Sequence, residues 1–248
     1  MIDKLLSRMS LFLWLSLALT ALFPLVALGA RWDLWGYRTA FSLLSGLSIT
    51  GAVLLAIVGF ALVASINRCN QAAKHSATAA VLILVLPMAY VFSNVYKARS
   101  LPVIHDISTD LENPPAFVHA SDIRSDAENS LEWQSDTALL QRGAYSDIQP
   151  IYLAMSVERA WGVVEQTLVH LPWEVTYHHR DKGIFEATST SFWFGFVDDI
   201  VIRLMADGDK TRVDVRSVSR VGKSDLGKNA QRIRFFRQAL IVTAGSSG

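Results

Sequence analysis

Cysteine is almost absent from this chain, which has a single one, Cys69, among its 248 residues. One cysteine forms no internal disulfide and does not supply the ligands of a cysteine-based metal site. The chain also lacks an excess of either charge, because 23 lysines and arginines nearly balance 22 aspartates and glutamates. Proteins that bind nucleic acids need a strongly basic surface, which a net charge of +1 does not indicate. We therefore expect no disulfide framework, no cysteine-bound metal and no nucleic-acid partner.

Long apolar runs are present, but only in the first hundred residues. They cover residues 9–29, 43–64 and 77–96, and none contains a charged side chain. A helix needs about 20 residues to cross about 30 Å of hydrocarbon, and a charge at its centre costs about 2.5 to 3.5 kcal/mol. The sequence therefore predicts three N-terminal transmembrane helices in residues 1–98. A cleaved signal peptide is the alternative for the first run, but the run is long and two more follow it.

The orientation in the membrane is not decided by lysine and arginine, which flank the predicted helices in equal number on the two sides. The first helix usually sets the orientation, and Lys4 and Arg8 precede it. The loop after it carries Trp32, Trp35 and Tyr37, which are typical of a membrane interface. We therefore predict a cytoplasmic N-terminus in a multi-pass inner-membrane protein. The polar part then lies outside, in the periplasm of a cell with two membranes.

The small residues of the second run allow two interpretations. Small side chains let helix backbones approach closely in lipid, so they serve either packing within the chain or docking of another membrane protein. The residues concerned are Gly46, Gly51, Ala52, Ala56 and Gly59.

Residues 99–242 have the patterns of an α+β domain, and residues 243–248 read as a flexible tail. Apolar spacing at a helical period covers residues 159–171 and ends at Pro172. A last helix is expected from Ser224 or Asp225 to about residue 241. Between the helices, four extended segments with turn residues between them cover residues 173–179, 183–190, 198–206 and 211–218. The pattern predicts an antiparallel four-stranded sheet with both helices packed on one face.

The segment that leads into this domain is irregular. Residues 101–117 contain three prolines among turn-forming residues, and a short helix is expected around residues 129–141. Because Ile104, Ile107 and Phe117 need cover, we expect this lead-in to wrap the domain.

The densest polar cluster lies between the last strand and the last helix, in residues 216–234. A helix start flanked by arginine and lysine is a ready-made anion site. We therefore predict that an anionic ligand binds there, with the aromatic residues near Phe194 holding any apolar part of it. The alternative is structural: Asp225 caps the helix, and the arginines pair with Asp198, Asp199 and Asp214. The predicted site comprises Arg216, Ser219, Arg220, Lys223, Ser224, Asp225 and Asn229, with Asp106, Asp110, Asp198 and Asp199 as polar partners.

Signals of catalysis or cofactor binding are weak. Asp198 and Asp199 are neighbours in an expected strand, so they point to opposite faces and at most one faces a given pocket. His105 and the nearby acids fall short of a closed metal site. The chain shows no Ser-His-Asp order, no glycine-rich phosphate loop and no zinc signature. We assign no catalytic residue, no metal and no cofactor. The aromatic residues 192–196 allow three interpretations: core, membrane surface or pocket lining.

Three segments resemble the bacterial domain of unknown function 1499: HDISTDLENPPAF from His105, FGFVDDIVIR from Phe194 and RSVSRVGKSDLGKNAQRIRFF from Arg216. The resemblance covers about residues 101–240. It implies a location in the envelope of proteobacteria-like cells, and it implies no established catalytic residue. The residues of these motifs that look family-like are Asp106, Asp110, Asp198, Asp199, Arg216, Ser219, Arg220, Asp225 and Asn229.

Three functional hypotheses follow from the sequence. The first is a non-enzymatic inner-membrane protein whose outer domain binds an anionic ligand, such as an anionic lipid, or an envelope protein. The second is an accessory subunit that docks on a membrane complex while its polar cluster is structural. The third is an envelope hydrolase with Asp198 or Asp199 as base, and it has the least support.

Overall fold

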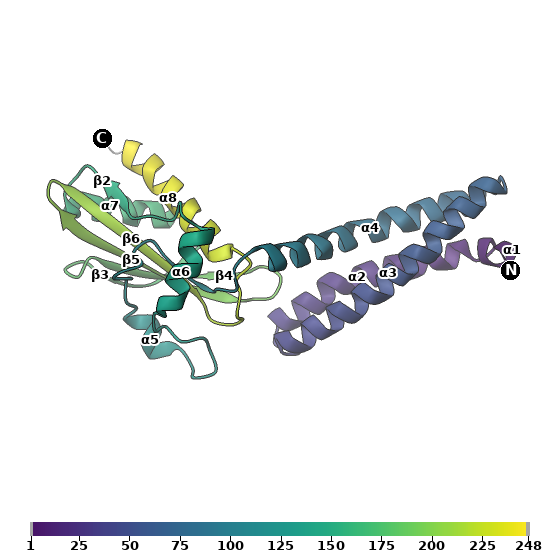
Figure 1. Ribbon diagram of the computed structural model, residues 1–248, viewed down its shortest axis with the longest axis horizontal. Coiled ribbons are helices and arrows are strands. Elements are labelled where there is room, and N and C mark those ends of the chain that lie inside the picture. The colour runs from purple at the N-terminus through teal and green to yellow at the C-terminus, as the bar shows by residue number, and fades with distance from the viewer. Residues whose placement is uncertain (1, 247–248) are drawn as a thin grey trace. The chain divides into compact units, whose positions relative to one another are not determined.

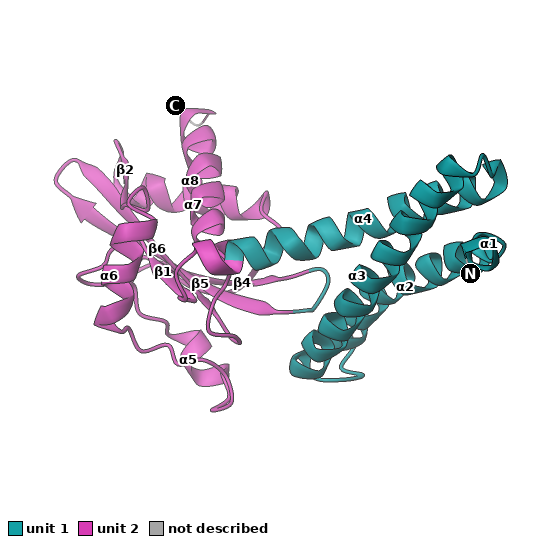
Figure 2. Ribbon diagram, turned by 45° about the vertical axis from the view of Figure 1, so that its right-hand side comes forward, with its two compact units in different colours: residues 1–97, 192–195 teal, residues 98–191, 196–248 magenta. Residues whose placement is uncertain are grey.

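The computed structural model describes residues 2–246, which fall into two compact units (Figure 1). The helical unit comprises residues 1–97 together with residues 192–195, and the polar unit comprises residues 98–191 and 196–248 (Figure 2). The division therefore falls one residue before the expected boundary, and the turn at residues 192–195 belongs to the helical unit.

The helical unit contains α1 (Ile2–Leu6), α2 (Met9–Arg31), α3 (Tyr37–Asn67) and most of α4 (Gln71–Ser100). With 23, 31 and 30 residues, α2, α3 and α4 are long enough and apolar enough to cross a membrane. Each predicted apolar run lies within one of these helices, so the three membrane-length helices are confirmed. Pro24 and Pro87 lie inside α2 and α4, as membrane helices tolerate.

Small side chains of α3 and α4 are buried in one apolar cluster of the helical unit. Ala61 of α3 and Ala77 of α4 are fully buried in the same apolar cluster. Among the small residues of α3, Gly51 serves this internal packing, because a Cβ there would lie 2.9 Å from Cε of Met88. A Cβ at Gly46 or Gly59 would meet nothing within 4 Å. Of the three glycines, packing within the chain therefore accounts for Gly51 but not for Gly46 or Gly59.

The polar unit is built on one antiparallel sheet of six strands, in the order β1-β6-β5-β4-β3 with β2 also paired to β6. The four predicted strands are present, but the predicted count of four was too low. The two additional strands have only three residues each, and their partner β6 lies far away in sequence. The strands are β1 (Asp106–Ser108), β2 (Ile151–Leu153), β3 (Glu174–His179), β4 (Ile184–Thr190), β5 (Val197–Asp207) and β6 (Lys210–Ser219).

One face of the sheet carries the apolar core and both predicted helices, α7 (Val157–Val169) and α8 (Lys228–Ser246). Alternate residues of β5, Ile200 and Ile202, point into this core with at most 1% exposure. Trp161 of α7 stacks on Phe185 of β4 with ring centroids 3.9 Å apart. The expected flexible tail is wrong for residues 243–246, which continue α8, and residues 247–248 lie outside the described part.

The lead-in wraps the domain, as predicted, and contains α5 (His119–Ile123) and α6 (Ser135–Ala144). The helix expected around residues 129–141 begins later, at Ser135. From α6, the side-chain amide of Gln141 accepts a hydrogen bond from the backbone N–H of Ser108 and donates one to its carbonyl. This side chain thereby pairs with the outer edge of β1 as another strand would.

Candidate functional site

The sheet divides the predicted site residues between its two faces. Asp199 and Arg216 lie on the face that the lead-in covers, whereas Asp198 and Ser219 lie on the face that α8 covers, where Asn229 of α8 contacts Ser219. The opposite directions expected for Asp198 and Asp199 are therefore confirmed. The same alternation separates Arg216 from Ser219, so the predicted residues do not converge on one ligand.

Arg216 is the centre of the first charge cluster on the lead-in face. Arg216 is only 3% exposed. Its guanidinium donates two hydrogen bonds to the carboxylate of Asp106, at 3.0 and 2.7 Å, and one to the backbone carbonyl of Leu131, at 2.7 Å. The rings of Phe117 and Trp133 have their centroids 5.5 and 5.4 Å from its Cζ, within reach of a cation–π interaction. The guanidinium of Arg216 therefore makes its hydrogen bonds and ring contacts with residues of the protein itself.

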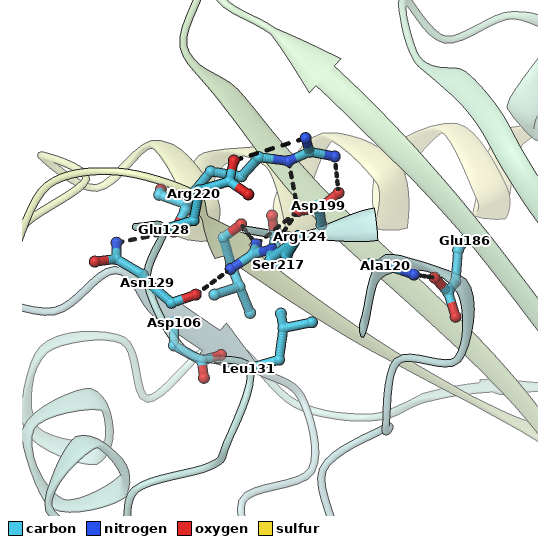
Figure 3. A network of polar contacts seen from close by, with 12 residues as sticks. Asp106, Ala120, Arg124, Glu128, Asn129, Leu131, Glu186, Asp199, Ser217 and Arg220 are labelled. Carbon is cyan, nitrogen blue, oxygen red and sulfur yellow. Dashed lines mark hydrogen bonds and ion pairs between the residues drawn. The ribbon is translucent and has the colours of Figure 1, made fainter. Parts of the chain in front are cut away.

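Asp199 forms the second cluster, together with two arginines (Figure 3). Arg124 donates from Nε at 2.8 Å, and Arg220 donates from Nε and Nη2 at 2.9 Å each. The hydrogen bonds from Arg220 to Asp199 raise the pKa of the Arg220 guanidinium, so its charge is secure. Arg124 also donates to the backbone carbonyls of Asn129 and Val218, which joins the lead-in to β6.

Glu186 forms a third contact with the lead-in, and it uses backbone groups only. This side chain of β4 is 1% exposed. Its carboxylate accepts the backbone N–H groups of Val118, His119 and Ala120 at the start of α5. Figure 3 draws the contact with Ala120. A carboxylate at this position satisfies N–H groups that a helix leaves without internal partners.

A fourth cluster lies toward the far end of β5 and β6. Arg203 and Arg212 both donate to Asp110 and to Asp214, at distances from 2.6 to 3.1 Å. Asp110 also accepts the backbone N–H groups of Glu112 and Asn113. The carboxylate of Asp110 therefore stabilises the turn that follows β1, and it also pairs with the two arginines of the sheet.

The four clusters have one consequence in common: each ties residues 106–133 to the sheet. Moving a charge out of water costs several kcal/mol per ion, and this cost is offset only when the charge is paired and hydrogen-bonded. Arg216, Asp199 and Asp214 meet that condition through the contacts given above, whereas Glu186 is stabilised by three backbone N–H groups. The arrangement explains why so many charged residues lie where β-strands are usually apolar.

On the helix face, Asp198 accepts a hydrogen bond from Arg232 of α8 at 2.5 Å. Asn229 donates to Ser219 Oγ at 3.0 Å and accepts from Ser217 Oγ at 2.8 Å. These contacts fix the start of α8 against β6.

The expected helix cap is occupied by the chain's own carboxylate. Asp225 accepts the backbone N–H groups of Gly227 and Asn229, at 2.8 and 2.6 Å. Burial raises the pKa of the Asp225 carboxyl, and these two N–H groups oppose the shift. Of the remaining predicted residues, Lys223 is exposed, and Ser224 Oγ accepts the N–H of Leu226. A bound anion would have to compete with Asp225 for the same N–H groups.

Sequence reasoning missed Arg124, Asn129, Glu186, Arg203 and Arg212 as members of the network. Glu186 had a signal, because a carboxylate between Phe185 and Ala187 in a strand requires a partner on the opposite face. Arg124 had none, since its partner Asp199 is 75 positions away.

Within residues 2–246, no group of three or more histidine, cysteine or acidic side chains is placed to hold a metal ion. Two open hollows occur in the polar unit. The larger, of about 630 Å³, lies beside Asp110, Arg142 and Arg212. The smaller, of about 310 Å³, lies between the end of α7 and strand β3, and its lining is mainly apolar.

The fold and the site define the class of protein: membrane-length helices are followed by an α+β domain whose buried charged side chains have partners within the domain itself. The family model described as "protein of unknown function (DUF1499)" matches residues 106–240, which is more than half of the chain, so this protein belongs to that family. No curated protein matches the chain. Among solved structures, that of TTHA0849 from Thermus thermophilus is 10% identical, and the match covers 40% of this chain and 96% of that one. Its TM-score of 0.26 is too low to support any argument.

Two arginines each donate two hydrogen bonds to one carboxylate, and the network predicts different losses of stability when each is removed. Arg216→Ala should cost about 3–5 kcal/mol of unfolding free energy, because it leaves Asp106 buried and unpaired. Arg234→Ala removes a pair with Asp147 whose side chains are 44% and 54% exposed, so it should cost about 1 kcal/mol or less. Chemical unfolding of the full chain in detergent measures both. Equal small losses would contradict a structural role for the buried network.

Proposed function

We propose that this protein is a membrane-anchored accessory protein, not an enzyme, whose polar domain lies in the periplasm and binds another envelope protein. The membrane-length helices α2 to α4 support the anchor. The observation that carries the proposal is the internal pairing of the charged residues. Groups that an enzyme or an anion receptor would present to a ligand are used here to hold the lead-in on the sheet.

The paired carboxylates also disfavour a hydrolase. A general base must reach the proton that it abstracts and must be available to accept it. Asp199 is 2% exposed and is engaged by Arg124 and Arg220, and Asp198 is engaged by Arg232.

The smaller hollow is a suitable surface for a protein partner. It is lined mainly by apolar residues, among them Val169, Trp173 and Val175, and it adjoins β3, the last strand on that side of the sheet. Val169 and Val175 are 78% and 43% exposed. An edge strand offers backbone groups to an extended peptide, and a neighbouring pocket selects one of its side chains. We therefore place the partner site at β3 and the end of α7.

Binding of an anionic ligand is the second candidate, and one observation favours it. Lys223 is exposed beside Arg220, whose side chain retains 19% exposure despite its pairing. The loop therefore still presents positive charge to solvent.

The partner site can be tested with the full chain, gently extracted from its own membrane and examined by native mass spectrometry. We expect a complex of fixed stoichiometry with another membrane or envelope protein. The double variant Val169→Glu and Val175→Lys should lose this complex, because it places charge in the apolar hollow. The matched control is Val242→Glu, which changes a 68% exposed apolar residue of α8 and should retain the complex.

The same spectra separate the two candidate functions. A complex that survives the double variant contradicts the site at β3. A retained phospholipid or small anion that is lost in both Arg220→Ala and Lys223→Ala, with unchanged melting temperatures, would establish the anion-binding function instead.

The periplasmic placement predicts the labelling of the native cysteine. Cys69 is exposed in the turn between α3 and α4, on the side of the membrane opposite to the polar unit if α4 spans once. A membrane-impermeant maleimide should leave Cys69 unlabelled in intact spheroplasts and label it after permeabilisation. Labelling in intact spheroplasts would place the polar unit in the cytoplasm.

A further inference from the structure

The aromatic turn at residues 192–195 is not explained by the core of the polar unit. It belongs to the helical unit, where Phe194 packs with an apolar cluster that includes Val26, Ala30 and Ala40. The rings of Phe194 and Phe41 have centroids 5.4 Å apart. Phe194 is therefore the residue that fixes the turn within the helical unit.

A second contact fixes the backbone of this turn. Arg31, the last residue of α2, donates a hydrogen bond from Nη1 to the backbone carbonyl of Phe192 at 2.6 Å. Its Cζ lies 5.6 Å from the centre of the Phe192 ring. Gly195 has φ +70°, and a Cβ there would lie 3.3 Å from Cγ of Arg31, so the close approach favours glycine.

The remaining side chains of this region are large, apolar and exposed. Phe192 and Trp193 are 68% and 46% exposed, and Trp32 and Leu34, in the connection from α2 to α3, are 62% and 67% exposed. The connection follows one membrane-length helix and precedes the next, so it lies at the depth where the hydrocarbon ends. Tryptophan and tyrosine are enriched at that depth, because their rings are apolar and their polar atoms reach water.

We propose that Trp32, Leu34, Phe192 and Trp193 form an interfacial collar that rests among the lipid headgroups of the membrane in which α2 and α3 lie. The occupant is lipid because the collar is continuous with the exposed apolar sides of these helices. Arg31, at the end of α2, fits this position, since a cation at the edge of the hydrocarbon is attracted to anionic lipid headgroups. The inference rests on the proposed membrane placement and adds a membrane contact made by the turn between β4 and β5.

Spin-label depth measurements test the collar. In a Cys69→Ser background, the full chain carries one nitroxide at Trp193→Cys or, separately, at Phe192→Cys, in nanodiscs of phosphatidylethanolamine and phosphatidylglycerol. Power saturation compares access of oxygen, which concentrates in lipid, with access of a water-soluble nickel chelate. Val53→Cys, at a 57% exposed position within α3, is the hydrocarbon control, and Val175→Cys, 43% exposed on β3, is the aqueous control.

The labels at residues 192 and 193 should give oxygen-to-nickel ratios several-fold above that of Val175→Cys and below that of Val53→Cys. Ratios equal to that of Val175→Cys, with Val53→Cys in hydrocarbon, would overturn the collar and leave the membrane anchor intact. An aqueous ratio at Val53→Cys would overturn the proposed anchor and the collar together.

Discussion

The fold of the polar unit depends on ion-pair or hydrogen-bond partners for the charged side chains that are buried between the lead-in and the sheet. Arg216 with Asp106, and Arg124 with Asp199, join segments 110 and 75 positions apart in the sequence, and Arg220 adds a second arginine to Asp199 from 21 positions away. A buried charge without a partner is strongly unfavourable, so the lead-in can adopt few other positions on the sheet. Segments of this kind are usually held by apolar packing. Here the irregular backbone is held by side chains that also satisfy its carbonyl and N–H groups.

Strand β5 shows how one segment serves two layers. Asp198 faces α8 and Arg232, whereas Asp199, the next residue, faces the lead-in and Arg124. The apolar residues that follow, Ile200 and Ile202, belong to the helix side. The two neighbouring carboxylates therefore join the layers on the two faces of the sheet, and they do not point toward one common pocket. Arg216, Ser219 and Asn229, which look family-like in the sequence, also join the sheet to the layer that covers it.

The regular part of the fold was predictable because its signals are local. Apolar runs of membrane length gave α2 to α4, and periodicity gave α7, α8 and strands β3 to β6. Strands β1 and β2 were not predictable, because three residues carry no period and the pairing with β6 is set by the tertiary structure. The end of α8 was misjudged, since small residues such as those from Thr243 onward are compatible with a helix as well as with a tail.

The candidate site was predictable in composition but not in arrangement. The acidic and basic residues were found, and their salt-bridged alternative was foreseen for Asp198, Asp199 and Asp214. Alternation along a strand was applied to Asp198 and Asp199, but the same rule applied to Arg216 and Ser219 would have separated them too. The partners Arg124 and Glu186 come from contacts over 66 to 75 positions, which no local pattern encodes.

The most direct test of this account is hydrogen exchange in the full chain, read at the amides of Val118, His119 and Ala120. These N–H groups lie outside the sheet, and only the buried carboxylate of Glu186 accepts them in the contacts described above. If the charge network holds the lead-in on the sheet, they should exchange as slowly as the amides of β5 and lose that protection together in Glu186→Gln. Exchange within seconds in the unmodified protein would show that the lead-in is a loose surface loop, and the central claim would fall.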